Sequence, residues 1–333
     1  MILKEKKVTL DDIARELDIS KNAVSLALRG KDGVSKELRE KVIAKANEMQ
    51  YQGLGKVQGC ILTLIPQRFT GEGSSFYHRL CFEMEAYAAS LGFQLIISSV
   101  SEMDEVQCRP PCLLSTVPCR GVITVGNLSR AYCRMIQKLG IRYVMADQYY
   151  EDIPMDSVTT ANTSGAYLMT SHLIENGHRS IQFFGTSFRT SSLEDRWIGY
   201  KRAMREHDLP VLSNPMQRRN LTAESYELIC EALDEMPEMP TAFVCGHDAT
   251  AHDLIRALEQ RGLHCPEDVS VVGFDNVQSY DILSLNLTTY STPSTGIAHA
   301  AIDLLQSEKG EYARRIQLFG EPVYRGSVRS LKD

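Results

Sequence analysis

Hydrophobic residues near the N-terminus recur at helical spacing in three short blocks. The first block predicts a helix that begins after Thr9, whose hydroxyl can cap a free backbone N–H. The second predicts a helix capped by Ser20, and the third predicts a helix over 35–49. The three apolar faces comprise Leu10, Ile13, Ala14 and Leu17; Ala23, Val24, Ala27 and Leu28; and Leu38, Val42, Ala46 and Met49. Two short helices joined by a tight turn have the layout of a helix-turn-helix DNA reader.

From residue 59 onward, short apolar strands alternate with helical stretches. The predicted strands are 59–65, 93–99, 121–126, 143–146, 180–185, 241–246 and 269–274. The predicted helices are 77–91, 129–139, 163–176, 195–207, 222–235 and 249–261. This alternation predicts an α/β fold with parallel sheets and right-handed crossovers. The region exceeds one compact sheet, so we expect two α/β lobes with a ligand cleft at the carboxyl ends of their strands.

Length and charge indicate more than one domain. At 333 residues the chain is longer than a single core usually supports, and its 43% hydrophobic and 23% charged residues are typical of a globular protein. Residues 1–56 hold 12 Lys/Arg and 9 Asp/Glu, a net charge of +3, whereas the remaining 24 basic and 33 acidic residues give −9. A positive head on a negative body suits salt-sensitive DNA contact through the head alone.

The segment "MILKEKK" lacks the apolar core of a signal peptide, and no apolar run approaches the roughly 18 residues that span a bilayer. We therefore expect a cytoplasmic protein without a membrane partner. Its nine cysteines scatter through apolar segments, which predicts reduced core residues rather than a disulfide framework. The cluster of Cys108, Cys112 and Cys119 lacks zinc-ligand spacing, so no metal is expected.

Enzyme motifs are absent from the sequence. It contains no glycine-rich dinucleotide or phosphate loop and no nucleophile elbow. His172, His178 and His207 are spread along the chain without a candidate partner. The sequence predicts no catalytic residues, no cofactor and no enzymatic activity.

The head closely resembles the DNA-binding domain of the lactose-repressor (LacI/GalR) family of transcription regulators. The resemblance rests on "DIA", "SKxxVSxxL", "VSxxLRxKV" and the closing Tyr51. It implies that Lys21, Asn22 and Leu26 read base edges; Lys can donate to guanine, Asn can pair with adenine, and Leu can only make apolar contact. Many members carry Arg at the position of Leu26, so operator preference should differ there. The full predicted DNA-contacting set is Thr9, Ser20, Lys21, Asn22, Ser25, Leu26, Arg29 and Leu54.

The body resembles the same family, whose core is a two-lobed sugar-binding-protein fold. The clearest matching segments are "TAFVCGHDATAHDLIRALEQRGLHCPEDVSVVGFDN", "LTTYSTP", "SGAYLMTSHLIENGHRSIQFFG" and "RWIGYKRAM". We expect a DNA-binding domain over 1–51, a linker over 52–58 and an effector-binding and dimerisation core over 59–333. The core would consist of an N-lobe of about 59–158 and 291–319 and a C-lobe of about 159–290 and 320–333.

The resemblance also implies an effector site in the cleft. Arg196 matches the arginine that reaches the effector, and Asp275 matches the acid that accepts hydrogen bonds from sugar hydroxyls or base N–H groups. Convergent polar groups of this kind are what a ligand cleft needs. Phe76 and Tyr77 match aromatic positions that stack on ligand rings. The further candidates are Asn127, Asp147, Ser192 and Leu221, for each of which a loop cap or core packing is an equal alternative.

Two departures from the family pattern leave the effector open. His247 precedes Asp248 where relatives usually have Asn; it could reach the ligand, or it could simply cap a helix. Ala161 replaces the usual Asp before Asn162. Sugar, sugar phosphate, nucleoside and purine therefore all remain candidates, with a sugar favoured because it is common in the family.

The linker differs most from the family pattern. Relatives usually have a hinge helix there that wedges a leucine into the minor groove. Here Gly53 and Gly55 each cost about 1 kcal/mol of helix propensity relative to Ala, and Leu54 is the one possible wedge. We therefore expect no standard hinge helix and less operator bending; the alternative is a degenerate regulator with poor DNA affinity.

These features together predict an effector-responsive repressor of sugar-utilisation genes. A homodimer would place two heads on a pseudo-palindromic operator. The rival interpretations are a transporter's solute-binding protein, a regulator that responds to a nucleoside or purine, and an enzyme with a regulatory head.

Overall fold

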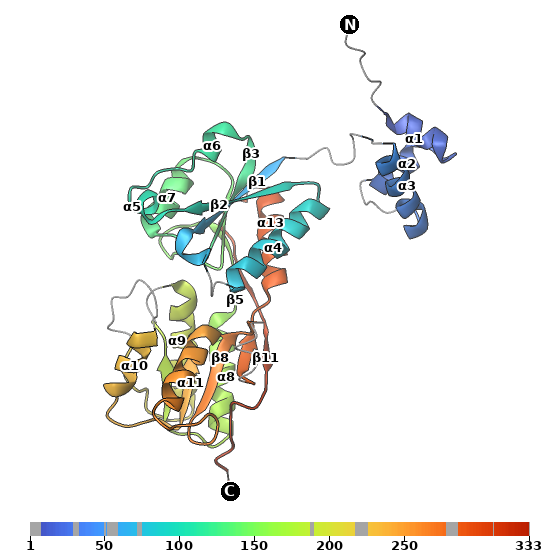
Figure 1. Cartoon of the computed structure of the whole chain (residues 1–333). Coiled ribbons are helices and arrows are strands. Elements are labelled where there is room, and N and C mark those ends of the chain that lie inside the picture. The colour runs from blue at the N-terminus through green and yellow to red at the C-terminus, as the bar shows by residue number, and fades with distance from the viewer. Residues whose placement is uncertain are drawn as a thin grey trace. The chain divides into compact units, whose positions relative to one another are not determined.

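The structure is a computed structural model, and it describes residues 8–28, 33–49, 51, 59–71, 75–186, 190–216, 226–277, 286–308 and 310–332. The chain divides into two compact units (Figure 1). The smaller comprises Met1–Gly59 with Gly92–Gln94, and the larger comprises Cys60–Leu91 with Leu95–Asp333. Over the described ranges, no helix combines the length and apolar character that crossing a membrane requires.

The smaller unit contains the three helices expected from the sequence. They are α1 (Leu10–Glu16), α2 (Lys21–Leu28) and α3 (Lys36–Glu48). Thr9 begins α1 through a capping box: its hydroxyl accepts a hydrogen bond from the Asp12 N–H, while the Asp12 carboxylate accepts one from the Thr9 N–H at 2.8 Å. The predicted apolar faces meet in one core, whose buried members are Ile13, Ala14, Val24, Ala27, Val42 and Ala46.

The larger unit contains two sheets. The first has the strand order β10-β5-β4-β3-β1-β2, and its β1–β3, β3–β4, β4–β5 and β5–β10 pairs are parallel. Its strands are β1 (Cys60–Pro66), β2 (Gln94–Val100), β3 (Cys119–Val125), β4 (Tyr143–Ala146), β5 (Asp156–Thr160) and β10 (Arg315–Leu318). The elements associated with this first lobe are η1 (Gln67–Phe69), α4 (Ser75–Ser90), α5 (Glu102–Val106), α6 (Leu113–Thr116), α7 (Arg130–Lys138) and α13 (Ser294–Gln306).

The second sheet has the order β11-β9-β8-β7-β6. Its strands are β6 (Ile181–Phe184), β7 (Ala242–Cys245), β8 (Ser270–Asp275), β9 (Thr288–Ser291) and β11 (Glu321–Val323). The β6–β7, β7–β8 and β8–β9 pairs are parallel, but β11 runs antiparallel to β9, so the expectation of fully parallel sheets is wrong at this edge. The chain leaves the second lobe after β9, passes through α13 and β10 in the first lobe, and returns in β11. Because β9 leads out of the second lobe and β11 leads back into it, the two strands run in opposite directions.

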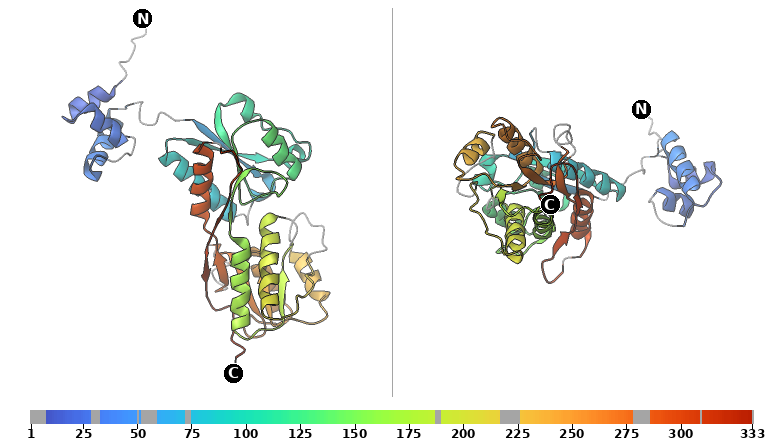
Figure 2. Two further views of the ribbon diagram at one scale, coloured as in Figure 1. Left: turned by 180° about the vertical axis from the view of Figure 1, so that it is seen from behind. Right: turned by 90° about the horizontal axis from the view of Figure 1, so that it is seen from below.

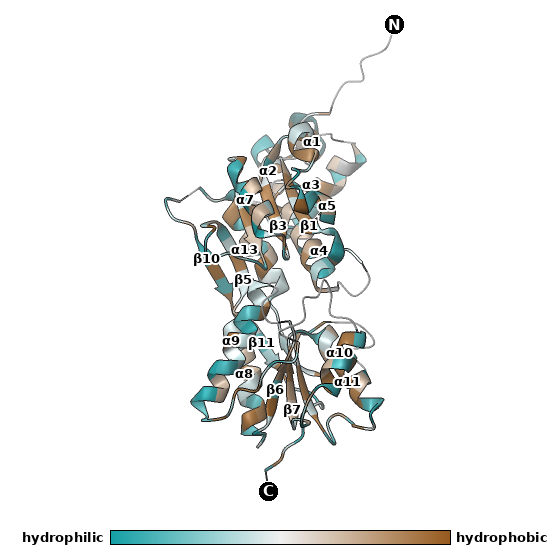
Figure 3. Cartoon of the chain, turned by 90° about the vertical axis from the view of Figure 1, so that its left-hand side faces the viewer, coloured by the Kyte–Doolittle hydropathy of each residue, from teal (hydrophilic) through white to brown (hydrophobic). Residues whose placement is uncertain are grey.

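Within the described residues, helices cover both faces of the second sheet (Figure 2). Alternate strand residues point to opposite sides, so Phe183 packs with α8 (Asn162–Glu175) and α9 (Ser191–Glu206), whereas Phe184 packs with α10 (Tyr226–Asp234) and α11 (Asp248–Glu259). Strands covered on both faces are often mainly hydrophobic, and β6 and β7 are largely brown in Figure 3. The predicted α/β class with two lobes is confirmed.

Several elements of the core were not expected from the sequence. These are β5, β9, β10, β11, α5, α6 and α13. In addition, α9 begins at Ser191 rather than 195, because the Thr190 hydroxyl accepts a hydrogen bond from the Leu193 N–H and caps the helix.

Gly199 lies where α9 packs against α8. A Cβ at this position would lie 2.1 Å from the carbonyl oxygen of Thr163, so Gly199→Ala must push the two helices apart. We expect a loss of about 1–3 kcal/mol in the free energy of unfolding, measured by urea denaturation. Gly296→Ala in α13 is the matched control, because its Cβ would lie 3.2 Å from the end of the flexible Leu318 side chain and in ordinary contact with Pro293 Cβ at 3.8 Å. Equal losses in both variants would rule out the helix contact as the cause.

Candidate effector site and DNA-binding head

The predicted effector residues lie where strands of both sheets end. Asp147 follows β4, His247 follows β7 by two residues, and Asp275 is the last residue of β8. Asp147 and Asp275 have φ values of 60° and 105°, in the left-handed region that only a few residue types enter readily. The chain therefore turns sharply at both carboxylates, at the edge where parallel α/β sheets bind ligands.

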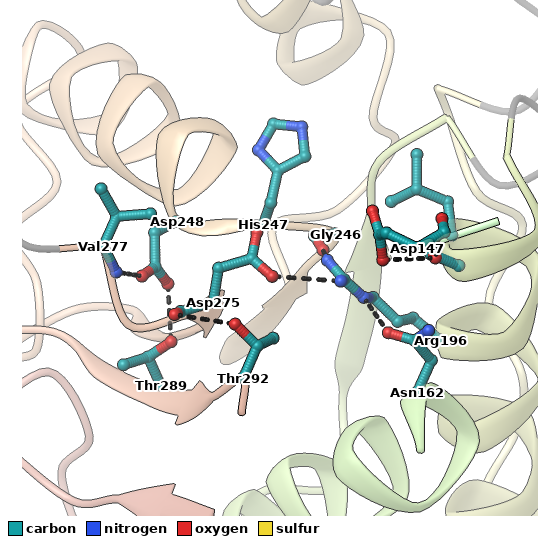
Figure 4. Close-up of polar contacts among 12 residues, drawn as sticks. Asp147, Asn162, Arg196, Gly246, His247, Asp248, Asp275, Val277, Thr289 and Thr292 are labelled. Atoms are coloured by element: carbon teal, nitrogen blue, oxygen red, sulfur yellow. Dashed lines mark hydrogen bonds and ion pairs between the residues drawn. The ribbon is translucent and has the colours of Figure 1, made fainter. Parts of the chain in front are cut away.

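Arg196 lies at the centre of the polar contacts in the second lobe (Figure 4). Its Nε donates to Asn162 Oδ1 at 2.9 Å, Nη1 donates to the Gly246 carbonyl at 2.6 Å, and Nη2 donates to Asp275 Oδ1 at 3.1 Å. The guanidinium also lies 3.8 Å from the centroid of the Phe274 ring. Arg196 is 5% exposed, so its charge is almost fully desolvated and depends on these partners.

Asp147 connects the two lobes. Its Oδ2 accepts a hydrogen bond from the Tyr77 hydroxyl of α4 at 3.2 Å, and its Oδ1 accepts one from the Ser192 hydroxyl of α9 at 3.2 Å. Burial raises the pKa of the Asp147 carboxyl to about 6, although the charge of Arg196 opposes this shift. The contact joins a residue at the end of a first-lobe strand to the first turn of a second-lobe helix.

Carboxylates outnumber the guanidinium in this cluster. Burial raises the pKa of Asp275, while Arg196 and His247 lower it. Burial and the charge of Asp275 raise the pKa of Asp248 to about 7. Tyr77 has a pKa well above its usual value, first because of burial and then because of the charges of Asp147 and Asp275. The structure thus brings together the predicted residues Tyr77, Asp147, Ser192, Arg196 and Asp275.

Aromatic rings add an apolar wall beside the polar cluster. Tyr77 packs edge-to-face on Phe76 at 5.1 Å between centroids and stacks on Phe69 at 4.5 Å. Phe69 was not predicted, although its place just after β1 is the same strand-end signal that identified other candidates. A Cβ at Gly126 would lie 3.0 Å from both Phe69 and Tyr77, which explains why this turn lacks a side chain.

The remaining effector candidates have other visible contacts. His247 caps α11, since its Nδ1 accepts a hydrogen bond from the Thr250 N–H at 3.1 Å, and its ring extends away from Asp275 in Figure 4. Asn127 Oδ1 accepts a hydrogen bond from Gln148 Nε2 at 3.1 Å. Leu221 falls outside the described residues.

Asp248 and Asn162 were not among the predicted site residues. Asp248 is fully buried; Oδ2 accepts from the Val277 N–H at 2.8 Å, and Oδ1 accepts from the Thr289 hydroxyl at 2.6 Å. Asn162 is also fully buried; its Oδ1 accepts a hydrogen bond from Arg196, and its Nδ2 has no partner within the described part of the chain. Asn162 therefore offers a spare donor next to the central arginine.

The DNA-contacting candidates of the head lie on or beside α1 and α2. Asn22 is exposed, and Lys21 forms an exposed ion pair with Asp11 at 2.7 Å, which costs little to exchange for a DNA partner. The Ser20 hydroxyl is occupied as a cap, accepting from the Ala23 N–H at 3.1 Å. Ser25 and Leu26 are half-buried. Arg29, Leu54 and the linker 52–58 lie outside the described residues.

Two architectural features define the class of protein: a helix-turn-helix head and a two-lobed α/β core with polar residues at the strand ends of both lobes. Residues 9–53 match the bacterial regulatory proteins of the lacI family, and residues 170–328 match the periplasmic binding protein-like domain. The head is thus a lacI-type DNA-binding domain and the core is periplasmic binding protein-like, a combination that defines a DNA-binding transcription regulator.

Named relatives cover nearly the whole chain. The HTH-type transcriptional repressor PurR of Vibrio parahaemolyticus serotype O3:K6 is 27% identical over 331 residues, spanning 97% of this chain and 99% of the relative. The ribose operon repressor of Haemophilus influenzae shows the same identity and the same coverage. All of these relatives are transcriptional repressors by name.

Solved structures share the fold. The transcriptional regulator CelR in complex with cellobiose has a TM-score of 0.68 at 20% identity, covering 96% of this chain and 100% of that one. The lac repressor dimer bound to operator and the anti-inducer ONPF has a TM-score of 0.67 at 21% identity, covering 98% and 100%. Throughout the described ranges, no three His, Cys, Asp or Glu side chains gather as a metal site would require.

Proposed function

We propose that the protein is a non-enzymatic, effector-responsive repressor that binds a pseudo-palindromic operator as a homodimer in the cytoplasm. The observation that carries the effector part is the cluster of Tyr77, Asp147, Ser192, Arg196 and Asp275, contributed by both lobes. An effector that exchanged hydrogen bonds with this cluster would change the contact between the lobes. Coupling between effector and operator would then be reciprocal, typically about 1–3 kcal/mol.

We propose a sugar as the effector, with a purine or nucleoside as the second candidate. Carboxylates and a guanidinium beside aromatic rings suit a polyhydroxylated ring, and CelR is a structural relative crystallised with cellobiose. The second candidate is supported by the relatives named PurR, because the same groups can pair with base N–H groups and stack on a purine.

A thermal-shift screen separates these candidates. The unaltered chain is heated with D-ribose, cellobiose, D-ribose 5-phosphate, guanine, hypoxanthine or guanosine, because tight binding to the folded state raises the melting temperature. A shift with the sugars supports the main proposal, and a shift with the purines alone supports the second. No shift with any compound in this set, at up to millimolar concentration, would contradict both.

Asn22→Ala should relax base preference at one operator position. Asn can pair with two atoms of one adenine, so its loss should remove about 1–3 kcal/mol of discrimination there while affinity for other sequences changes little. Competition binding to single-base variants of the chain's own promoter fragment, at fixed salt, measures this. Exposed Glu16→Ala on α1 is the control. A uniform loss across all fragments would assign Asn22 to the phosphate backbone instead.

A further inference from the structure

A second contact between the lobes lies outside the effector cluster. Tyr149, in the loop between β4 and β5, donates a hydrogen bond from its hydroxyl to Asp195 Oδ1 of α9 at 2.8 Å. Its backbone N–H donates to the Ser191 hydroxyl at 3.2 Å. A first-lobe loop is thus held to two successive turns of a second-lobe helix, at the side chain and at the backbone.

The Asp195 carboxylate depends on this contact. Asp195 is 7% exposed, and its Oδ2 has no hydrogen-bond partner among the residues that the structure describes. The Tyr149 hydroxyl is the one donor to this carboxylate seen in the described part of the chain. A buried carboxylate with a single donor is costly to leave unpaired. Losing the tyrosine hydroxyl should therefore strongly disfavour the arrangement in which the Tyr149 loop lies against Asp195.

Arg315 supports the tyrosine from the other side. Its guanidinium lies 3.8 Å from the centroid of the Tyr149 ring, and Nη1 and Nη2 pair with the two carboxylate oxygens of Glu151 at 3.0 and 3.2 Å. Arg315 is the first residue of β10, the strand that precedes the last crossing into the second lobe. The ring is therefore held between a first-lobe cation and a second-lobe anion.

Asp195 is the neighbour of Arg196 on α9. Successive helix residues point about 100° apart, so one turn of α9 directs Asp195 to Tyr149 and Arg196 to Asp275. A shift of α9 that alters one contact must alter the other. Asp195 and Arg196 therefore link the contact between the lobes to the proposed effector site through the backbone of α9, although within the described segments they share no hydrogen-bond partner.

We propose that Tyr149, Asp195 and Ser191 form an interlobe latch that sets the fraction of molecules with closed lobes. Asp195 is a positioning residue for Arg196 in this arrangement, and it need not touch the effector. The consequence for effector affinity rests on the proposed function, because only the closed fraction would offer the complete site.

Tyr149→Phe tests the latch without any effector. Hydrogen exchange of the full-length chain, followed by mass spectrometry, should show roughly tenfold or faster exchange in the peptides that cover 147–150 and 191–196. Tyr167→Phe is the matched control: it removes a tyrosine–carboxylate bond of 2.7 Å to Glu206 at the other end of α9, within one lobe. The same exchange pattern in both tyrosine variants would overturn the proposal.

Two further variants guard against misfolding. Ser191→Ala removes the acceptor of the Tyr149 N–H but leaves the Thr190 cap of α9 intact, so it should increase exchange in 147–150 with an unchanged melting temperature. Asp195→Asn retains an acceptor for the hydroxyl and should exchange like the unaltered chain. If neither Ser191→Ala nor Asp195→Asn behaves as expected, the latch proposal is wrong.

The effector arm uses D-ribose and hypoxanthine as probes. Whichever compound stabilises the unaltered chain should bind Tyr149→Phe more weakly, in proportion to the closed fraction that the variant loses. If exchange increases but affinity does not fall, the latch stands and its link to the site is wrong. If neither compound binds the unaltered chain, the effector assignment fails while the exchange comparison still decides the latch.

Discussion

Arg196→Met should lower the free energy of unfolding by about 3–5 kcal/mol at pH 8, the usual cost of breaking a buried ion pair by removing one partner. The substitution keeps apolar volume above Phe274 but leaves Asp275 without its cation. The Gly246 carbonyl and Asn162 Oδ1 lose their donors as well. Urea denaturation of the full-length chain measures the loss.

The double variant Arg196→Met/Asp275→Asn is the decisive comparison. A neutral amide needs no counter-charge, so the double variant should recover a large part of the loss of the single variant. Both variants should lose their response to the effector found by thermal shift while retaining operator affinity, because the helix-turn-helix core contains neither residue. If the double variant is as unstable as the single one, the ion pair is not the source of the effect.

The pH dependence of the single variant provides an independent check. Removing Arg196 takes away the group that most strongly lowers the pKa of Asp275, so the carboxyl should be protonated more readily in the folded chain. A folded-state pKa above the unfolded one disfavours the folded state as pH rises. The stability deficit of Arg196→Met should therefore shrink towards acid pH, and a deficit that is constant from pH 5 to pH 8 would contradict this explanation.

The pattern of hydrophobic residues predicted the strands whose side chains are both apolar and fully buried. "YVMA" was predicted as a strand over 143–146 and is β4. In contrast, β5 reads "DSVTT" and is buried at all five positions despite four polar residues. Its Thr159 and Thr160 are fully buried, and over the described ranges their hydroxyls have no hydrogen-bond partner. Hydrophobic alternation cannot reveal a strand of this kind, because four of its five side chains are polar and its partner β10 comes from a distant part of the chain.

The candidate site also combines residues that the sequence identified with pairings that it did not reveal. Strand-end position and family resemblance together identified Asp147, Arg196 and Asp275, which do converge. The contact of Tyr149 with Asp195 joins residues 46 positions apart, and nothing near either one in sequence indicates it. At His247 the sequence left a ligand and a cap as alternatives, and the structure shows the cap. Pairings made by tertiary packing are therefore the part that sequence reasoning could not supply.

Asp248→Asn should make the protein more stable than the unaltered chain above pH 7. Burial raises the pKa of Asp248 to about 7, and the charge of Asp275 adds to the shift, although hydrogen bonds from Thr289 and Val277 oppose it. The folded chain thus retains a proton that the unfolded chain has released over much of the range from pH 4 to pH 7. Stability from this group is complete at acid pH and is lost as pH rises through about 7.

The asparagine side chain fits the same contacts. Its Oδ1 can accept from the Val277 N–H, and its Nδ2 can donate to the Thr289 hydroxyl oxygen, where the carboxylate now accepts at 2.8 and 2.6 Å. Because the pKa rises from 3.8 to about 7 and each pKa unit corresponds to about 1.4 kcal/mol, we expect the variant to gain about 4 kcal/mol at pH 8.5 and nearly nothing at pH 4. Urea midpoints at half-unit steps of pH measure the difference between the two curves.

Asp147 adds a slope of the same sign to both proteins, since burial raises its pKa to about 6. The slope that disappears in Asp248→Asn should therefore span about pH 4 to pH 7, and its part between pH 6 and pH 7 is largely free of the Asp147 contribution. Asp234→Asn is the control: its carboxylate forms an ion pair with Arg261 and is 66% exposed, so this change should leave the slope intact. Parallel curves for Asp248→Asn and the unaltered chain would show that Asp248 is ionised in the folded protein across the whole range, with the Thr289 and Val277 hydrogen bonds outweighing burial.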